Sequence, residues 1–275
     1  AGVKVTLISR RGLLPEAEPE IGEALTNYFE NEGIEVVSGI SYEHIKERNG
    51  SVILSVQDKG VTREISSEKV LVATGRAPNV ESLNLGLAGI ELNEVGGGKV
   101  DERLRTTREN VYAAGDVTGR DQFVYMAAYG AKIAAKNALN SNPVSYDNSA
   151  MPAVVFTDPQ IASVGLTEAQ ARQQGSDIRT SVLTLDNVPR ALAARDTRGL
   201  IKLVADAKTK KLVGAHILAP EGSDSIQTAA LAIKMGMTYE DLGAMIFPYL
   251  TTVEGLKLAA QTFDMDVKKL SCCAG

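Results

Sequence analysis

The two cysteines of the chain, Cys272 and Cys273, stand side by side close to its end. Adjacent Cα atoms lie only ~3.8 Å apart, so a disulfide between these two residues would be strained and easily reduced. As thiols they form a two-sulfur clamp that suits a soft metal ion taking two ligands in a line, such as Hg(II). The positive charges of Lys268 and Lys269 should favour the thiolate forms. We therefore predict that both cysteines are metal ligands and catalytic thiols. The alternative is a chance pair at a chain end, where most residues are tolerated.

Length and composition indicate a globular chain with room for about two domains. Of its 275 residues, 44% are hydrophobic and 23% are charged, and the formal net charge is −5. This acidic balance argues against nucleic acid as a partner, because proteins that bind it carry a basic face. No apolar run reaches the length of a membrane span and no signal-peptide pattern occurs, so we expect no membrane span and a cytoplasmic location. Two cysteines are too few for a disulfide framework, which leaves ligand or redox chemistry for the pair.

The first part of the chain has the pattern of a partial nucleotide-binding α/β domain, which we assign to residues 1–75. Alternating β-branched residues predict a strand over 3–9. Apolar residues at helical spacing predict a helix over 20–31, entered through Pro19. A second strand starts at Ile34, so the order is strand, helix, strand, and we expect a parallel sheet.

Two further features belong to this first domain. Residues 51–56 and 61–65 flank the turn signal Asp58-Lys59-Gly60, which predicts an antiparallel hairpin. Residues 70–73 are apolar and predict a buried strand. The chain has no initiating Met and opens on a strand with no turn before it, so we expect it to be a fragment that begins within a domain.

The end of the first predicted strand reads Ser9-Arg10-Arg11. In doubly wound dinucleotide sites an acid at this place binds the ribose 2′-hydroxyl of NAD, whereas an arginine accommodates the 2′-phosphate of NADP. No acid is present and two guanidinium groups can bind a phosphate, which favours NADPH. The alternative is a solvated basic turn. The glycine-rich phosphate loop that should precede this strand is not in the chain.

Residues 76–149 change in character. A strand of small residues is predicted over 110–116, and an alanine-rich helix over 122–139. Small residues before Gly115 would let the backbone approach a ligand closely. Asp116, at the carboxyl end of the strand, is placed to accept a hydrogen bond from a ligand hydroxyl.

Residues 150–275 alternate between strand and helix patterns, and we expect an α+β domain with an antiparallel sheet. The fold class is therefore α/β plus α+β. His44 lies in a polar stretch and His216 in an apolar strand, so we interpret them as a surface and a core residue rather than as ligands. The expected strands cover 153–156, 161–164, 179–185, 200–205 and 212–218, and the expected helices cover 167–174, 225–235, 239–245 and 253–262.

Several motifs along the whole chain resemble those of the flavoprotein pyridine nucleotide-disulfide oxidoreductases. The similarity corresponds to the later portion of that family. It implies the second part of an NADPH domain, the returning segment of an FAD domain over 76–149, and an interface domain over 150–275 with a Cys-Cys tail. The motifs are Ala73-Thr74-Gly75-Arg76-Ala77-Pro78-Asn79, Thr106-Thr107-Arg108-Glu109-Asn110-Val111-Tyr112-Ala113-Ala114-Gly115-Asp116, residues 151–160 (MPAVVFTDPQ), Asn187-Val188-Pro189-Arg190-Ala191-Leu192, Phe247-Pro248-Tyr249-Leu250-Thr251 and Ser271-Cys272-Cys273-Ala274-Gly275.

The resemblance implies cofactors and their contacts. NADPH would pass a hydride to FAD, which would reduce a cysteine pair that is missing here together with the first half of the FAD domain. Asp116 would hold the ribityl chain of FAD, and Val124 would lie against the flavin edge. Arg10 would meet the 2′-phosphate. Three neighbours complete the implied cofactor contacts: Arg11, Gly75 and Gly115.

One position departs from the disulfide reductases of this family. Where they carry a histidine acid/base in a His-Pro-Thr-x-x-Glu run, this chain reads Tyr249-Leu250-Thr251-Thr252-Val253-Glu254. Reducing a disulfide requires protonation of a leaving thiolate, whereas reducing a thiolate-bound metal ion needs no such donor. A phenol can instead steer the ion between thiol pairs. We therefore assign Tyr249 and Glu254 to catalysis with Cys272 and Cys273; the alternative for Tyr249 is an ordinary half-buried aromatic residue.

The leading hypothesis is an enzyme that reduces Hg(II), delivered as thiol complexes, to Hg(0) with NADPH through FAD. The resemblance also implies a symmetric homodimer, because the interface domain of one subunit completes the active site of the other. The chain alone is expected to be inactive, since the flavin-proximal cysteines and the phosphate loop are missing. One alternative is another flavin disulfide reductase, such as a dihydrolipoamide dehydrogenase. Another is a non-catalytic dimerising metal-binding fragment.

Overall fold

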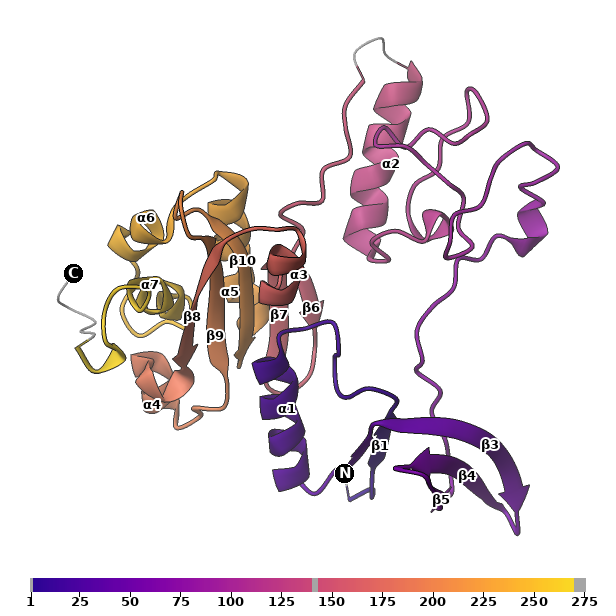
Figure 1. Cartoon of the computed structure of the whole chain (residues 1–275), viewed down its shortest axis with the longest axis horizontal. Helices are drawn as coiled ribbons and strands as arrows, with labels where there is room; N and C mark the ends of the chain where they lie inside the picture. The colour runs from indigo at the N-terminus through magenta and orange to yellow at the C-terminus, as the bar shows by residue number, and fades with distance from the viewer. Residues whose placement is uncertain (1, 140–142, 270–275) are drawn as a thin grey trace. The chain divides into compact units, whose positions relative to one another are not determined.

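The computed structural model describes residues 2–139 and 143–269, which fall into two compact units (Figure 1). Residues 1–70 and 149–275 form the first unit, and residues 71–148 form the second. The predicted fold class is confirmed, because a parallel strand pair and two antiparallel sheets are present. The predicted domain boundaries after residues 75 and 149 stay a prediction.

The first unit opens with the predicted strand, helix, strand order. Strand β1 (Thr6–Ser9) pairs in parallel with β2 (Glu35–Ser38), and α1 (Pro19–Asn31) connects them. Pro19 occupies the first turn of α1, where its missing N–H removes no helical hydrogen bond. Ile21 and Leu25 bury the apolar face of the helix.

The predicted hairpin is confirmed as β4 (Ser51–Asp58) and β5 (Val61–Ser67), which pair antiparallel. A third strand, β3 (Ile40–Arg48), pairs with β4 on its other side. Strand β3 is not predicted from the sequence, because most of its side chains are exposed and it lacks the apolar alternation of a half-buried strand. His44 lies on this strand and is exposed, as predicted.

Two predicted strands are wrong. Residues 70–73 form no strand, and Leu71 is 89% exposed. Residues 110–116 contribute only an isolated bridge between Tyr112 and Arg105 before a 3-10 turn, Asp116–Thr118. Apolar runs of this kind become strands only where neighbouring strands accept their backbone hydrogen bonds, and the part of the chain that the structure describes supplies no such ladder for either run.

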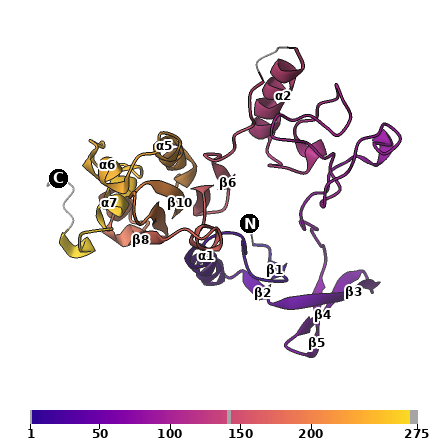
Figure 2. The same cartoon turned by 45° about the horizontal axis from the view of Figure 1, so that its top comes forward.

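The expected antiparallel sheet of the later part is confirmed (Figure 2). Its spatial order is β6-β7-β10-β9-β8, with every neighbouring pair antiparallel. The five strands are β6 (Ala153–Val155), β7 (Gln160–Gly165), β8 (Ile178–Thr184), β9 (Leu200–Asp206) and β10 (Leu212–Ala219).

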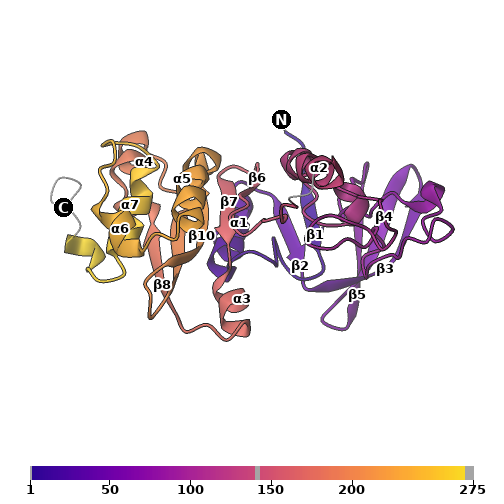
Figure 3. The ribbon, with the colours of Figure 1, turned by 90° about the horizontal axis from the view of Figure 1, so that it is seen from above.

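Helices cover both faces of this sheet (Figure 3). The alternation of side chains along β9 sets the two faces. Ile201, Leu203 and Ala205 pack into the main core, whereas Leu200 packs with α1 and Val204 packs with Ala171 of α3. The main core is completed by four helices, α4 (Pro189–Ala194), α5 (Gly222–Lys234), α6 (Tyr239–Ala244) and α7 (Glu254–Gln261), and the opposite face by α1 and α3 (Glu168–Gln173).

The second unit is built on α2 (Val124–Leu139), which confirms the predicted alanine-rich helix. Gly130 allows close packing, since a Cβ there would lie 3.3 Å from the Cβ of Ala114. Leu104, 2% exposed, fills the same region. Within residues 2–139 and 143–269, no helix is long and apolar enough to cross a membrane.

An ionic cluster lies between α1 and the five-stranded sheet. Lys202 of β9 is 2% exposed, and its Nζ lies 2.8 Å from Glu18 Oε2, 2.8 Å from Glu20 Oε1 and 3.0 Å from Glu168 Oε2. Glu18 is also buried, and its Oε1 accepts a hydrogen bond from the backbone N–H of Glu168 at 2.6 Å. Charge-assisted hydrogen bonds in this cluster therefore join Glu18, just before α1, to strand β9 and to the start of α3.

His216 borders this cluster and is buried, as predicted for a core residue. Its Nε2 lies 3.0 Å from the carbonyl oxygen of Leu166, which places the ring proton there as donor. Burial lowers the pKa of His216, with Lys202 contributing, and these effects outweigh the hydrogen bond to Leu166 and the carboxylates of Glu18 and Glu20.

We expect His216 to make the stability of the first unit pH-dependent. Its folded pKa lies below the unfolded value of ~6.5, so the unfolded chain binds a proton first as the pH falls. The stabilising contribution is complete above pH ~6.5 and is lost as the pH drops through the folded pKa. Between about pH 8 and pH 5, the free energy of unfolding measured with urea should fall more steeply for wild type than for His216→Asn. Parallel pH curves for the two proteins would remove His216 from this role.

Candidate functional site

The Tyr249 loop, residues 247–253, leads into α7 in the first unit. The Tyr249 side chain is 56% exposed, so its phenol is accessible from solvent. The next residue, Leu250, has a positive φ of 61°, an uncommon conformation for a bulky residue that packing and hydrogen bonds must hold in place. The loop therefore presents an aromatic hydroxyl group at a defined place.

Glu254, the first residue of α7, holds this loop. It is 2% exposed, and its Oε2 accepts a hydrogen bond from the backbone N–H of Leu250 at 3.2 Å. The backbone N–H of Glu254 donates to Thr251 Oγ1 at 3.3 Å, and that hydroxyl donates to the carbonyl oxygen of Pro248 at 2.8 Å. Glu254 is thus placed to position the Tyr249 backbone, and a direct part in catalysis stays a prediction.

Cys272 and Cys273, the predicted metal ligands, lie outside the described residues. Among residues 2–139 and 143–269, no group of three or more His, Cys, Asp or Glu side chains is arranged to hold a metal ion. The assignment of the two thiols as ligands therefore rests on the sequence.

The predicted 2′-phosphate contacts lie at the end of β1. Arg10 and Arg11 are both exposed, and the guanidinium of Arg11 pairs with Glu16 Oε1 at 2.6 Å. For Arg10 no ion pair or hydrogen bond is present within the described part of the chain. An exposed pair such as that of Arg11 is worth little, so either guanidinium can turn to a phosphate. The role of both residues stays a prediction.

The predicted FAD contacts lie in the second unit. Gly115 has φ +79°, and a Cβ there would lie 3.0 Å from the Cβ of Ala127, so both conformation and space favour glycine. Asp116, the first residue of the 3-10 turn that follows, is exposed, and Val124 at the start of α2 is 86% exposed. Gly75 is also exposed, with φ +106°. An accessible carboxylate and an accessible apolar side chain fit the needs of an FAD ribityl chain and flavin edge, and the assignment stays a prediction.

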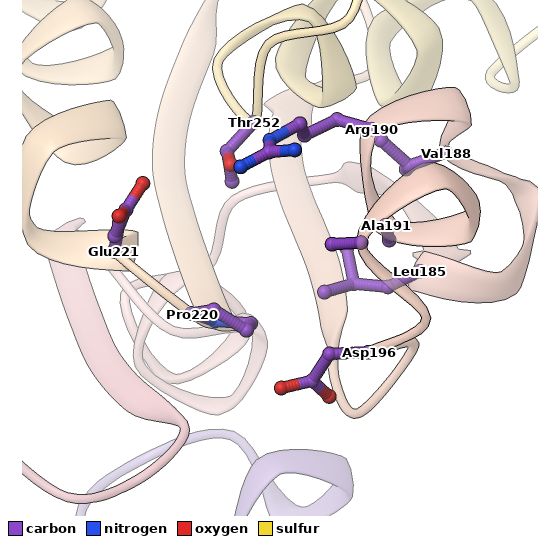
Figure 4. A pocket seen from close by; sticks show the side chains of 9 residues that line it. Leu185, Val188, Arg190, Ala191, Asp196, Pro220, Glu221 and Thr252 are labelled. Carbon is purple, nitrogen blue, oxygen red and sulfur yellow. The ribbon is translucent and has the colours of Figure 1, made fainter.

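A pocket of about 160 Å³ opens beside the Tyr249 loop (Figure 4). Arg190 of α4 and Thr252 of the loop lie together at one side, and Glu221, just before α5, lies across from them. In the sequence, Arg190 stands out only as part of a motif, and no role for it is predicted. The signal available was a cation two residues after Val188 in the run Val-Pro-Arg. The remaining lining residues are Leu185, Val188, Ala191, Ala194, Asp196 and Pro220.

The chain matches a known family over most of its length. Residues 1–135 match the family described as pyridine nucleotide-disulphide oxidoreductase, and residues 151–260 match the dimerisation domain described under the same name. The fold and these matches define a nucleotide-binding α/β segment joined to a dimerisation-type α+β domain. The chain belongs to the pyridine nucleotide-disulphide oxidoreductase family.

Comparison with individual proteins gives a more specific similarity than the family match. The chain is 49% identical to a mercuric reductase of Bacillus cereus and 49% identical to one of Acidithiobacillus ferrooxidans, with 100% of this chain covered in both. It covers 44% and 49% of those proteins, so it spans about half the length of the curated relatives it matches. Among solved structures it is similar to the Cu(II) complex of the HOCl-induced flavoprotein disulfide reductase RclA from Escherichia coli. The TM-score is 0.84 at 31% identity, covering 95% of this chain and 59% of that one.

Proposed function

We propose that this chain is the part of a mercuric reductase that contains the dimerisation domain and the returning segment of the FAD domain. The whole enzyme would detoxify mercury by the reaction Hg(II) + NADPH → Hg(0) + NADP⁺ + H⁺. The observation that carries the proposal is the Tyr249 loop. An exposed phenol stands where the resemblance places the histidine acid/base of disulfide reductases. A phenol is a poor proton shuttle near neutrality, since its pKa is ordinarily ~10. It remains suited to guiding a soft cation.

Each residue then has a defined task in the proposed reaction. Bound FAD would supply the relay that takes a hydride equivalent from NADPH and delivers two electrons to the metal site. Cys272 and Cys273 bind Hg(II) as thiolates and hand it inward, and Tyr249 steers the ion. Glu254 keeps the loop in place through its hydrogen bond from Leu250.

The proposal includes a homodimer and a cytoplasmic location. The match of residues 151–260 to a dimerisation domain supports the first. Exposed apolar side chains support it as well, since Leu231 and Met235 on and beside α5 are 58% and 74% exposed and Ile246 is 98% exposed. The cytoplasm keeps thiols reduced, as a pair of metal-binding cysteines requires.

A direct assay tests the proposed function. The full-length form, carrying the flavin-proximal cysteines, should show a flavin absorption spectrum and oxidise NADPH only when Hg(II) is added. Dihydrolipoamide or other dithiol substrates should give little turnover. Mercury-independent turnover of a disulfide substrate would instead identify an ordinary disulfide reductase. Absence of any flavin would leave a non-catalytic metal-binding protein.

The Arg10 side chain should set the preference for NADPH over NADH. In Arg10→Glu of the same full-length form, a carboxylate would face the 2′-phosphate, and like charges in a binding site cost several kcal/mol. We expect the affinity for NADPH to fall by at least about tenfold, which corresponds to ~1.4 kcal/mol, while NADH binding changes little. Arg63→Glu, in an exposed ion pair on β5, is the matched control. Equal losses for both nucleotides in Arg10→Glu would contradict the assignment.

A further inference from the structure

The pocket beside the Tyr249 loop combines an apolar floor with opposite charges on facing sides. Leu185, Val188 and Pro220 contribute apolar surface. The guanidinium of Arg190 and the side chain of Thr252 lie at one side, and the carboxylate of Glu221 lies across from them (Figure 4). Small-ligand sites commonly have this form, an apolar lining with a few polar groups that fix orientation.

The third charged residue of the pocket is already neutralised. The carboxylate of Asp196 binds Arg198, with Oδ2 at 2.8 Å from Nη2 and Oδ1 at 2.9 Å from Nε. These hydrogen bonds from Arg198 lower the pKa of Asp196, so it remains a paired carboxylate at neutral pH. In the described part of the chain, neither Arg190 nor Glu221 has such a partner. The pocket therefore offers one available cation and one available anion.

The backbone places both of these groups. Arg190 stands in the first turn of α4, directly after Pro189 at the start of that helix. Glu221 precedes α5 with φ 57°, and its carbonyl oxygen accepts a hydrogen bond from the N–H of Asp224 at 3.1 Å. Because α4 and α5 both pack into the main core, the backbone positions from which the two side chains extend are held in place.

We propose that this pocket binds the zwitterionic α-amino-carboxylate group of a small amino acid. The ligand carboxylate pairs with the guanidinium of Arg190 and the hydroxyl of Thr252, and the ligand ammonium pairs with Glu221. Guanidinium and carboxylate match in a planar, two-point geometry, which makes arginine the usual carboxylate receptor. The volume of about 160 Å³ lies below the roughly 300 Å³ at which sites for larger ligands begin, so one small amino acid is the fitting class.

The amino acid can be a thiol carrier such as cysteine or a non-thiol amino acid such as serine, because both present the same zwitterion. Thr252 lies three residues after Tyr249, so a bound amino acid would sit beside the loop that the proposed metal chemistry uses. The binding claim itself requires neither flavin nor mercury. Its failure is therefore distinguishable from failure of the proposed function.

An NMR titration of the intact chain tests the proposal under reducing conditions, following the backbone amides of residues 190–196 and 221–222. L-Cysteine and L-serine should both produce saturable shifts, with a Kd on the order of 1 mM, as two charge-assisted contacts would give. Cysteamine lacks the carboxylate and 3-mercaptopropionate lacks the ammonium, so each should bind at least about tenfold more weakly.

Variants locate the binding site. Arg190→Gln and Glu221→Gln should each weaken L-serine binding by at least about tenfold, and both residues are exposed, so the fold should tolerate the changes. Arg195→Gln removes an exposed cation from the end of the same helix without lining the pocket and should leave binding unchanged. Tighter binding of L-cysteine than of L-serine would support a thiol carrier. Cysteamine binding as well as L-cysteine, L-serine failing to bind, or Arg190→Gln behaving as wild type would each overturn the proposal.

Discussion

Replacing Lys202 with Met should lower the free energy of unfolding of the first unit by about 3–5 kcal/mol, the usual loss when one partner of a buried ion pair is removed. Lys202 is 2% exposed and lies within 3.0 Å of three carboxylates. Burial alone would lower its pKa, but hydrogen bonds to Glu18, Glu20 and Glu168 outweigh burial and raise it. The lysine is therefore a cation in the folded protein, and Met would leave the buried Glu18 carboxylate without its counter-charge.

Urea unfolding of the intact chain measures this effect. Lys208→Met is the matched control, because it makes the same chemical change at an exposed position and should stay within about 0.5 kcal/mol of wild type. Adding Glu18→Gln to Lys202→Met should recover part of the loss, since the buried group left behind is then uncharged. If Lys202→Met unfolds at the same urea concentration as Lys208→Met, the cluster does not stabilise the fold.

Replacing both Cys272 and Cys273 with Ala in the full-length form should slow the reduction of thiol-bound Hg(II) by on the order of 10²-fold. Because of their high effective concentration, two linked ligands can bind a metal roughly 10²–10⁴ times more tightly than a single one. The double variant loses both ligands. In the proposed function, thiolate exchange would let a metal pass stepwise from this pair to an inner pair without release as a free ion. The relay therefore matters most when competing thiols surround the metal.

Three comparisons isolate the relay. Flavin reduction by NADPH should be unchanged in the double variant, because no hydride passes through the tail. Mercury halides, whose small ligands can reach an inner pair directly, should lose less activity than the thiol complex. Ser271→Ala alters the same tail without removing a thiol and should behave as wild type. If wild type and the double variant turn over the thiol complex equally, Cys272 and Cys273 have no role in this reaction.

Local patterns in the sequence were enough to predict most of the elements. The short apolar runs of β9 and β10 and the helical spacing in α5 and α7 are both local signals, because a buried strand needs apolar residues over only a few positions and a helix repeats every 3.6 residues. Pro19 at the start of α1 acts through its own fixed φ and missing N–H, so it too can be interpreted without knowing the fold. The departure at Tyr249 is likewise visible in a single short motif.

Ion pairs, pockets and strand partners depend on tertiary contacts and cannot be predicted from any local sequence pattern. Lys202 and Glu18 are 184 residues apart, and only the packing of α1 on the sheet makes a lysine in the apolar run of β9 tolerable. The pocket depends in the same way on Arg190, Glu221 and Thr252, which three separate segments bring together. Residues 70–73 show the converse, because an apolar run predicts a strand but its backbone needs neighbouring strands to complete the hydrogen bonds. Periodicity reflects the chain's own geometry, whereas ion pairs, pockets and strand partners depend on which distant groups the folded chain brings within bonding distance.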